Sequence, residues 1–148
     1  MTQPIELLDQ DATDAERFVI AWLTPFVELL SPPGGVDIRR RSGDALPFAI
    51  VREAANSEDG QQMTAYPTVS VHWLAATESD CRSFSKDGHR RMLVLARDPL
   101  TVVDFGDGES ANAQWLETDH APIWVDYRND QIFRRVSRYR IALPFTDI

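Results

Sequence analysis

The chain has 148 residues, 43% of them hydrophobic, and a formal net charge of -8. This length and composition predict one folded domain covering residues 1–148. The excess of acid argues against broad nucleic-acid binding, which needs Lys and Arg against phosphates. The apolar runs are too short for a transmembrane helix, and the acidic N-terminus lacks the basic start of a secretory signal. We therefore expect synthesis in a reducing cytosol and no membrane partner, and the single cysteine, Cys81, leaves no intrachain disulfide.

The charge is distributed unevenly along the chain. Residues 1–16 carry five carboxylates, and residues 98–126 carry seven, with no Lys or Arg in either segment. Residues 127–148 carry five arginines against two aspartates. Such polarisation predicts complementary surfaces.

The first predicted element is a helix. Residues Thr13 to Glu16 have the spacing of a capping box, with Thr13 as the cap, and apolar residues follow at helical spacing up to Leu30. Pro25 should kink or tighten this helix, and the segment SPPGG at residues 31–35 should end it.

A predicted hairpin comes next. Residues 46–55 and 66–77 have strand composition, and the polar residues 54–65 between them predict a flexible hairpin tip.

Thr77 can cap a second helix over residues 78–97. Gly88 lies on its apolar side, which predicts a close approach to a sheet. The predicted inner face is Cys81, Phe84, Ser85, Gly88, Met92, Leu95 and Ala96, and the predicted outer face is Arg82, Lys86, His89, Arg90 and Arg97.

The rest of the chain predicts strands joined by turns at residues 106–110 and 128–130. The element order is then α-β-β-α-β-β(-β). We expect an α+β fold with a mostly antiparallel sheet and two main helices packed on one face.

Chemical motifs are missing from the sequence. His72, His89, His120 and Cys81 lack the spacing of metal ligands, and no nucleophile elbow is present. The glycines at residues 106 and 108 form a turn and lack the pattern of a phosphate loop. We predict no catalytic, cofactor-binding or metal-binding residue, and no enzyme activity.

The stretch QIFRRVSRYRIALPF, residues 131–145, sorts into two faces by strand alternation. Its odd positions are mainly apolar and should face the helices, whereas Arg134, Arg138 and Arg140 project from the other side. The simplest interpretation is a solvated face. The alternative is a subunit contact, in which these arginines meet acidic residues of a neighbouring copy and head-to-tail contacts close a ring. The candidate acidic partners are Asp104, Asp107 and Glu109, for which a solvated acidic loop is the simpler account.

Several segments together resemble the tail-terminator family of long-tailed bacteriophages, in the short forms of actinobacteriophages. They are DAERFVIAWLTPFVELL, LPFAIVREAANSEDG, YPTVSVHWLAAT, RRMLVLARDPL and WVDYRNDQIFRRVSRYRIALPF, and they cover most of the chain. The resemblance implies a small α+β virion protein that forms a hexameric ring on the tail tube. This ring stops tube polymerisation and offers a surface to the neck.

The resemblance also implies partners. They are the major tail tube protein, a neck or connector protein, and DNA as a passing, non-specific occupant of the ring lumen. The acidic residues 98–126 are a candidate lumen lining. The polar tip is a candidate docking element, with Glu58, Asp59, Gln61 and Gln62 as its contact residues.

Two alternatives remain. The chain could be another neck protein, such as a head-completion or head–tail joining subunit. It could also be a small host binding module or enzyme, which would need a concave pocket with convergent polar groups, for instance around His72 or His120.

Overall fold

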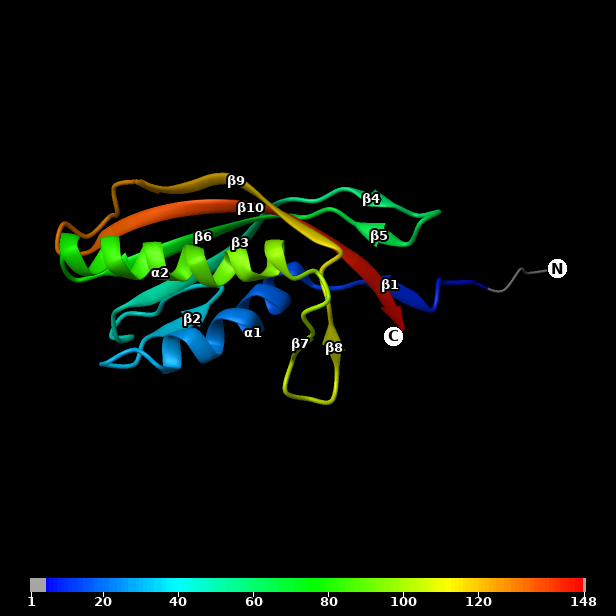
Figure 1. Cartoon of the computed structure of the whole chain (residues 1–148), viewed down its shortest axis with the longest axis horizontal. Helices are drawn as coiled ribbons and strands as arrows, with labels where there is room; N and C mark the ends of the chain where they lie inside the picture. Colours follow the sequence, from blue (N-terminus) through cyan, green and yellow to red (C-terminus); the bar gives the residue numbers. More distant parts are fainter. Residues whose placement is uncertain (1–4, 148) are drawn as a thin grey trace.

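The computed structural model describes residues 5–147, so residues 1–4 and 148 of the predicted domain lie outside the described part. It is an α+β fold, as predicted, with both helices on the same face of a large, mostly antiparallel sheet (Figure 1). The elements are β1 (Gln10–Ala12), α1 (Ala15–Glu28), β2 (Gly35–Asp37), β3 (Phe48–Ala55), β4 (Glu58–Asp59), β5 (Thr64–Ala65), β6 (Thr68–Ala75), α2 (Glu78–Arg97), β7 (Val103–Asp104), β8 (Ser110–Ala111), β9 (Trp115–Trp124) and β10 (Phe133–Asp147).

Strand β10 organises the sheet. The sheet order is β2-β3-β6-β10-β5-β4, and β9 and β1 also pair with β10. The first part of this 15-residue strand lies between β6 and β9, whereas its last residues pair with β1 and β5. Strands β7 and β8 form a separate hairpin that projects on the helix side (Figure 1). One strand therefore holds two sets of partners at its two ends.

The N-cap of helix α1 lies one residue after the predicted cap, Thr13. Its N-cap is Asp14, whose carboxylate accepts from the backbone N–H of Arg17 at 3.1 Å. The prediction of Thr13 was wrong, because its hydroxyl donates to the carbonyl of Pro144 at 2.8 Å and so fastens the start of the helix to β10. Glu16 likewise accepts from the backbone of Glu53 on β3, at 2.9 Å, and does not reach back to a cap. Thr13 and Glu16 thus form hydrogen bonds to strands β10 and β3 and do not form the predicted capping box.

Helix α2 begins as predicted, with the Thr77 hydroxyl accepting from the backbone N–H of Asp80 at 3.0 Å. The predicted close approach at Gly88 is confirmed, because a Cβ built there would lie 2.3 Å from the ring of Trp73. This proximity also brings His89 to the sheet, where its Nδ1 lies 2.7 Å from the hydroxyl of Tyr139. The prediction of His89 on the outer face was therefore wrong. Ala96, predicted on the inner face, is exposed because the helix leaves the sheet at its end.

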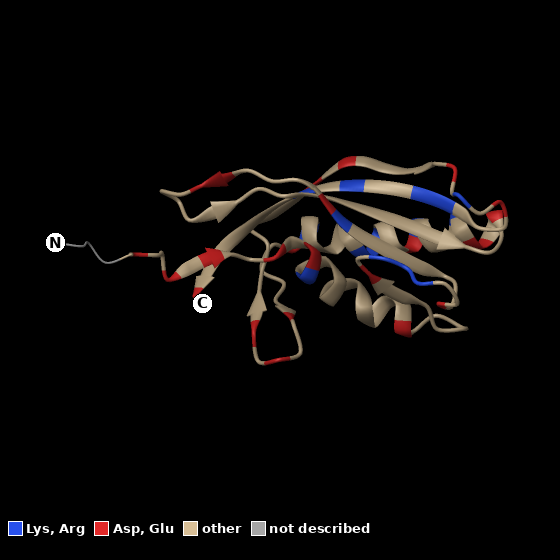
Figure 2. Cartoon of the chain, turned by 180° about the vertical axis from the view of Figure 1, so that it is seen from behind, with Lys and Arg blue, Asp and Glu red and all other residues tan. Residues whose placement is uncertain are grey.

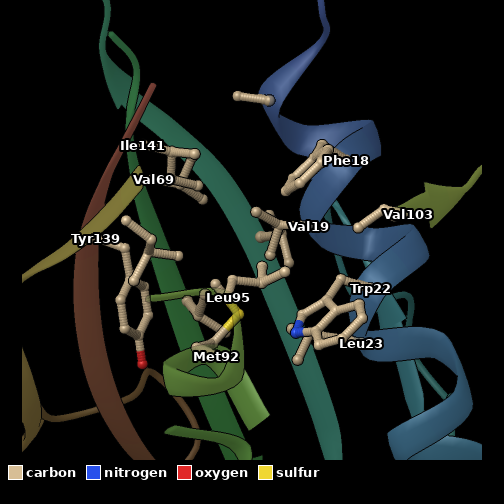
Figure 3. Close-up of a cluster of buried hydrophobic side chains, with 14 of the residues drawn as sticks. Phe18, Val19, Trp22, Leu23, Val69, Met92, Leu95, Val103, Tyr139 and Ile141 are labelled. Atoms are coloured by element: carbon tan, nitrogen blue, oxygen red, sulfur yellow. The ribbon is translucent and has the colours of Figure 1, made fainter. Parts of the chain in front are cut away.

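The hydrophobic core lies between the two helices and the sheet (Figure 3). Four odd positions of β10 face it as predicted, since Ser137, Tyr139, Ile141 and Leu143 are each 0% exposed, whereas Phe133 at the start of the strand is 36% exposed. Trp73 spans the layers, since its ring packs under Gly88 and its indole N–H donates to Ser137 at 2.8 Å. The alternating pattern of the strands therefore predicted this face correctly.

The predicted hairpin at residues 54–65 is present, with β4 antiparallel to β5. Its return strand is fixed to the sheet, because Thr64 and Ala65 are buried and pair with Pro144 and Leu143 of β10. The flexibility of the tip stays a prediction.

Candidate functional site

The outer face of the sheet, on the side away from the helices, carries a row of basic residues. Across the central strands, Arg52 of β3 and Arg138 of β10 both lie opposite Ser70 of β6. Arg134 lies four residues before Arg138 and opposite Leu74. Figure 2 shows Lys and Arg positions, coloured blue, along strands of the sheet. The predicted sorting of Arg134 and Arg138 onto one face is confirmed by this register.

A groove of about 300 Å³ opens at the start of β10 on this outer face. We call it the arginine groove. It includes His72, Tyr127 and Asp126 together with five arginines, namely Arg39, Arg40, Arg52, Arg128 and Arg134. Sheet pairing and two loops bring these arginines together from four separate stretches of sequence. An acidic protein thus concentrates a third of its basic side chains, five of 15, in one groove.

Arg134 is held firmly in the arginine groove. Its Nη2 donates to the carbonyl of Asp126 at 2.5 Å, and its guanidinium lies 5.4 Å from the centre of the Tyr127 ring. Within residues 5–147, however, the buried Nε atoms of Arg40, Arg134 and Arg138 have no hydrogen-bond partner. Buried N–H donors are normally satisfied. A carboxylate or phosphate oxygen bound on this face would supply acceptors for them.

His72 lies between these arginines on β6. Burial, followed by the charges of Arg134, Arg52 and Arg138, lowers the pKa of its imidazole from 6.5 to about 4. The ring is therefore neutral at neutral pH, and its Nδ1 lies 3.5 Å from Nη1 of Arg134. The same field that disfavours a cationic imidazole favours an anion.

Arg140, the third predicted contact arginine, has different surroundings. It is exposed and lies opposite Glu117 of β9 on its own chain. Directly opposite residues on neighbouring strands are close enough to interact. Arg140 therefore lies beside a carboxylate, whereas Arg134 lies in the arginine groove.

The acidic candidates of the β7–β8 hairpin are partly paired within the chain. Arg17 of α1 forms ion pairs with Asp107 and, at 2.8 Å, with Glu109. A backbone hydrogen bond from Glu109, with the charge of Arg17, lowers the pKa of Asp107. Asp104 accepts from the backbone of Gly106 at 2.8 Å and is exposed. A role of these three residues in a subunit contact stays a prediction.

The polar tip lies at the opposite end of β10 from the arginine groove. Glu58, Gln61 and Gln62 are exposed, and Asp59 accepts from the backbone N–H groups of both glutamines at 3.0 and 3.1 Å. Figure 2 shows acidic residues here, on the neighbouring β1 and on the β7–β8 hairpin. The acidic hairpins and the arginine groove thus occupy separate regions of one elongated molecule, although Asp126 lines the groove and Glu16 pairs with Arg52 at 3.7 Å.

The chain matches no family model and no curated protein. Among residues 5–147 no three His, Cys, Asp or Glu side chains are placed to hold a metal ion. No helix in that part is long and apolar enough to cross a membrane.

The sequence did not identify Arg39, Arg40, Arg52 and Arg128 as members of a site with Arg134. The basic run at residues 39–41 was a visible signal. Its neighbours in space are fixed by the parallel pairing of β2 with β3 and by the antiparallel pairing of β3, β6 and β10, none of which local pattern reveals.

Proposed function

We propose that the chain is a structural protein of a phage virion that assembles head to tail into a ring, with six copies as the expected number. The ring caps the tail tube, ends its polymerisation and provides the surface that joins the neck. The observation that carries the proposal is the separation of two unlike surfaces, the arginine-bearing outer face and the acidic hairpins. The sequence resemblance to tail terminators supports the same assignment.

Two unlike, complementary patches favour a heterologous contact. If the outer face of one copy meets an acidic hairpin of the next, every copy gives one contact and receives another, and a suitable rotation closes the series into a ring. Two copies facing each other through their arginines would instead suffer like-charge repulsion. The distribution of charge therefore disfavours contact between two arginine-bearing faces and favours contact between an arginine-bearing face and an acidic hairpin.

Capping a tube needs binding and no reaction. One side of the ring must fit the last ring of the tail tube protein, and the other must fit the neck protein without recruiting more tube subunits. The exposed tip residues Glu58, Gln61 and Gln62 are the proposed docking contacts. DNA would pass through as a non-specific occupant, with residues 98–126 as the proposed acidic lining.

The double variant Arg138→Glu and Arg140→Glu tests the assembly. We expect the ring to be lost in light scattering, and capping of purified tail tubes to be lost in electron microscopy. Arg97→Glu is the matched control, because its side chain is 78% exposed at the end of α2, away from the outer face. Unchanged assembly of the double variant at low salt would contradict the charge contact, and a wild-type chain that never binds tubes would overturn the proposal.

A different neck role predicts a different particle. Without a terminator, phage tails grow beyond their normal length, whereas without a joining protein, tails of normal length stay detached from heads. Electron microscopy of particles made without this chain therefore separates the two assignments.

The arginine groove favours a second candidate, an anion-binding module of the host cell. Its five arginines converge around one concavity, as a binding site for a small anion requires. Titration with inorganic phosphate, citrate and a nucleoside triphosphate, followed by NMR shifts of the groove residues, tests this candidate. Saturable binding by the isolated chain, without tube binding, would favour it over the terminator.

A further inference from the structure

The first described residues form an exposed arm. In residues 5–9, Ile5 is 91% exposed, Leu7 82% and Leu8 57%. Glu6 and Asp9 alternate with these apolar side chains and are also exposed. Three large apolar side chains within four residues, all facing water, make this arm a candidate contact segment.

The arm leaves the body of the protein at β1. Gln10 pairs with Asp147, at the end of β10, and Figure 1 shows the chain before β1 continuing away from both helices and the sheet. The arm therefore points outward from the acidic end of the molecule.

A second groove, of about 380 Å³, lies between α2 and β9. We call it the α2–β9 groove. Ala121 and Pro122 give it apolar surface, and the other lining residues are basic or histidine: Arg82, Lys86, His89, Arg90 and Arg135. Arg135 fixes its shape by donating to Ser85 at 3.0 Å and to the carbonyl of Pro122 at 2.8 Å.

The rim of this groove keeps a positive field. Arg82 pairs with Glu78 at 3.0 Å, and Arg90 pairs with Asp87 at 3.6 Å. Both pairs are exposed and within one helix, and such pairs are weak. Lys86, between them, is exposed and forms no ion pair among residues 5–147. An acidic and apolar segment matches this groove in both charge and hydrophobicity.

We propose that the arm, residues 5–9, of one copy binds in the α2–β9 groove of the next copy. Leu7 and Leu8 lie against Ala121 and Pro122, and the carboxylates of Glu6 and Asp9 lie towards Lys86 and Arg90. This contact rests on the proposed head-to-tail assembly and adds a second contact between neighbouring copies to the proposed charge contact.

The occupant comes from another copy because the arm cannot reach its own groove. Arg135 of the groove precedes Asp147 on β10 by twelve residues, which a strand spans in ~40 Å. The stretch from Ile5 to Gln10, fully extended, covers at most ~18 Å. An arm that begins at the far end of β10 therefore meets a neighbouring molecule first.

The contact joins two different surfaces, and in the proposed head-to-tail form each copy exchanges them with two different neighbours. Each copy carries the arm at one end of β10 and the α2–β9 groove near the other end, so it can give one arm and receive one. Repetition produces a chain or a closed ring.

A disulfide trap tests the proposal on the full chain. Leu7→Cys combined with Lys86→Cys places one thiol on the arm and one at the groove, while Cys81 is 0% exposed and stays as a silent background. After mild oxidation we expect a ladder of covalent multimers on a non-reducing gel, collapsing to monomer with reductant. The matched control is Leu29→Cys with Lys86→Cys, because Leu29 is 87% exposed and lies outside the arm.

Three other outcomes overturn the proposal. They are a ladder no stronger than that of the control, a crosslink confined within single chains, and a product that stops at the dimer, which would show reciprocal exchange between two copies. Far-UV circular dichroism of each variant confirms that it is folded. Since covalent trapping accumulates even brief contacts, a weak association of the wild type still gives a result.

A mixing experiment tests whether the contact runs from the arm of one copy to the α2–β9 groove of another. An arm variant, Leu7→Ser with Leu8→Ser, and a groove variant, Lys86→Glu with Arg90→Glu, should each lower the association constant at least tenfold. Mixed together, they retain one intact arm and one intact groove, so light scattering should show one-to-one dimers and nothing larger. Full-size oligomers from either variant alone would overturn the proposal.

The two proposals fail in different ways. Tubes that are capped normally by the arm variant would reject the arm contact and leave the terminator role standing. Trapped multimers that never bind a tube would keep the arm contact and reject the terminator role.

Discussion

The two faces of the sheet differ in how their side chains are satisfied. On the helix face, Trp73, Tyr139 and Ile141 are 0% exposed and pack against both helices, with the Trp73 indole and the Tyr139 hydroxyl both bonded. On the outer face, Arg134 and Arg138 each keep a buried Nε without a partner among residues 5–147. On the helix side, Arg135 at the α2–β9 groove also keeps a buried Nε without a partner among residues 5–147. The core of the helix face is thus satisfied within one chain, whereas the outer face and the α2–β9 groove have donors to offer to another molecule.

The largest expected effect is on the helix face. Phe18→Ala removes a side chain that is 0% exposed, and the lost burial together with the cavity should lower the free energy of unfolding by about 3–5 kcal/mol. Urea denaturation measures this loss. Leu29→Ala is the control, with a change of at most ~0.5 kcal/mol for an exposed site. Similar losses in the two variants would remove the distinction between core and surface.

Gly88→Ala should come second. The new Cβ would lie 2.3 Å from the Trp73 ring, so the helix or the ring must move. Overpacking costs about 1–3 kcal/mol, and the better helix propensity of alanine returns about 1 kcal/mol. We expect a net loss of about 0–2 kcal/mol in urea denaturation. At Gly60, where nothing lies within 4 Å, the same substitution should be almost neutral, and a stabilised Gly88→Ala protein would show that the close contact is not required.

The free energy of unfolding should depend on pH through His72 on the outer face. Since the pKa of His72 is about 4 in the folded chain and near 6.5 when unfolded, the unfolded chain binds the extra proton between these values. Stability contributed by neutral His72 is thus present above pH 6.5 and is lost as the pH falls towards 4. His72→Gln should reduce the drop in urea midpoint between pH 7 and pH 5. An equal drop in the variant would contradict the assignment.

The smallest effect on stability should come from Arg140. It is exposed and opposite Glu117, so Arg140→Gln should change the free energy of unfolding by no more than ~0.5 kcal/mol in urea denaturation. Light scattering of the same sample should still show weaker assembly. A large loss of stability would instead place Arg140 among the groups that hold the fold together.

Local pattern predicted the helix face well, because helical spacing and strand alternation report which side chains are buried. Thr77 and Gly88 behaved as predicted, since one acts on its own helix and the other on the strand beside it. Thr13 and His89 were misplaced because their partners, Pro144 and Tyr139, are 131 and 50 residues away along the chain. Sequence spacing alone does not show such partners.

The arginine groove was recovered only in part for the same reason. Strand alternation identified Arg134, but Arg39, Arg40 and Arg128 lie in connections whose position depends on which strands pair. The short strands β1 and β2 were also missed, because three residues are too few to show a period and both depend on a distant partner. The pairing of strands that are far apart in the sequence therefore determines where the arginines cluster in this protein.

The central place of β10 also has a consequence during translation. Strand β6 is made about 60 residues before its neighbour, since Leu74 pairs with Arg134 and Val69 with Tyr139. Until β10 leaves the ribosome, β6 has β3 on one side and a bare hydrogen-bonding edge on the other, and such edges attract other chains. Residues 78–132 therefore have to be made before this edge is covered, and a chain cut before β10 would keep it exposed to pairing with other chains.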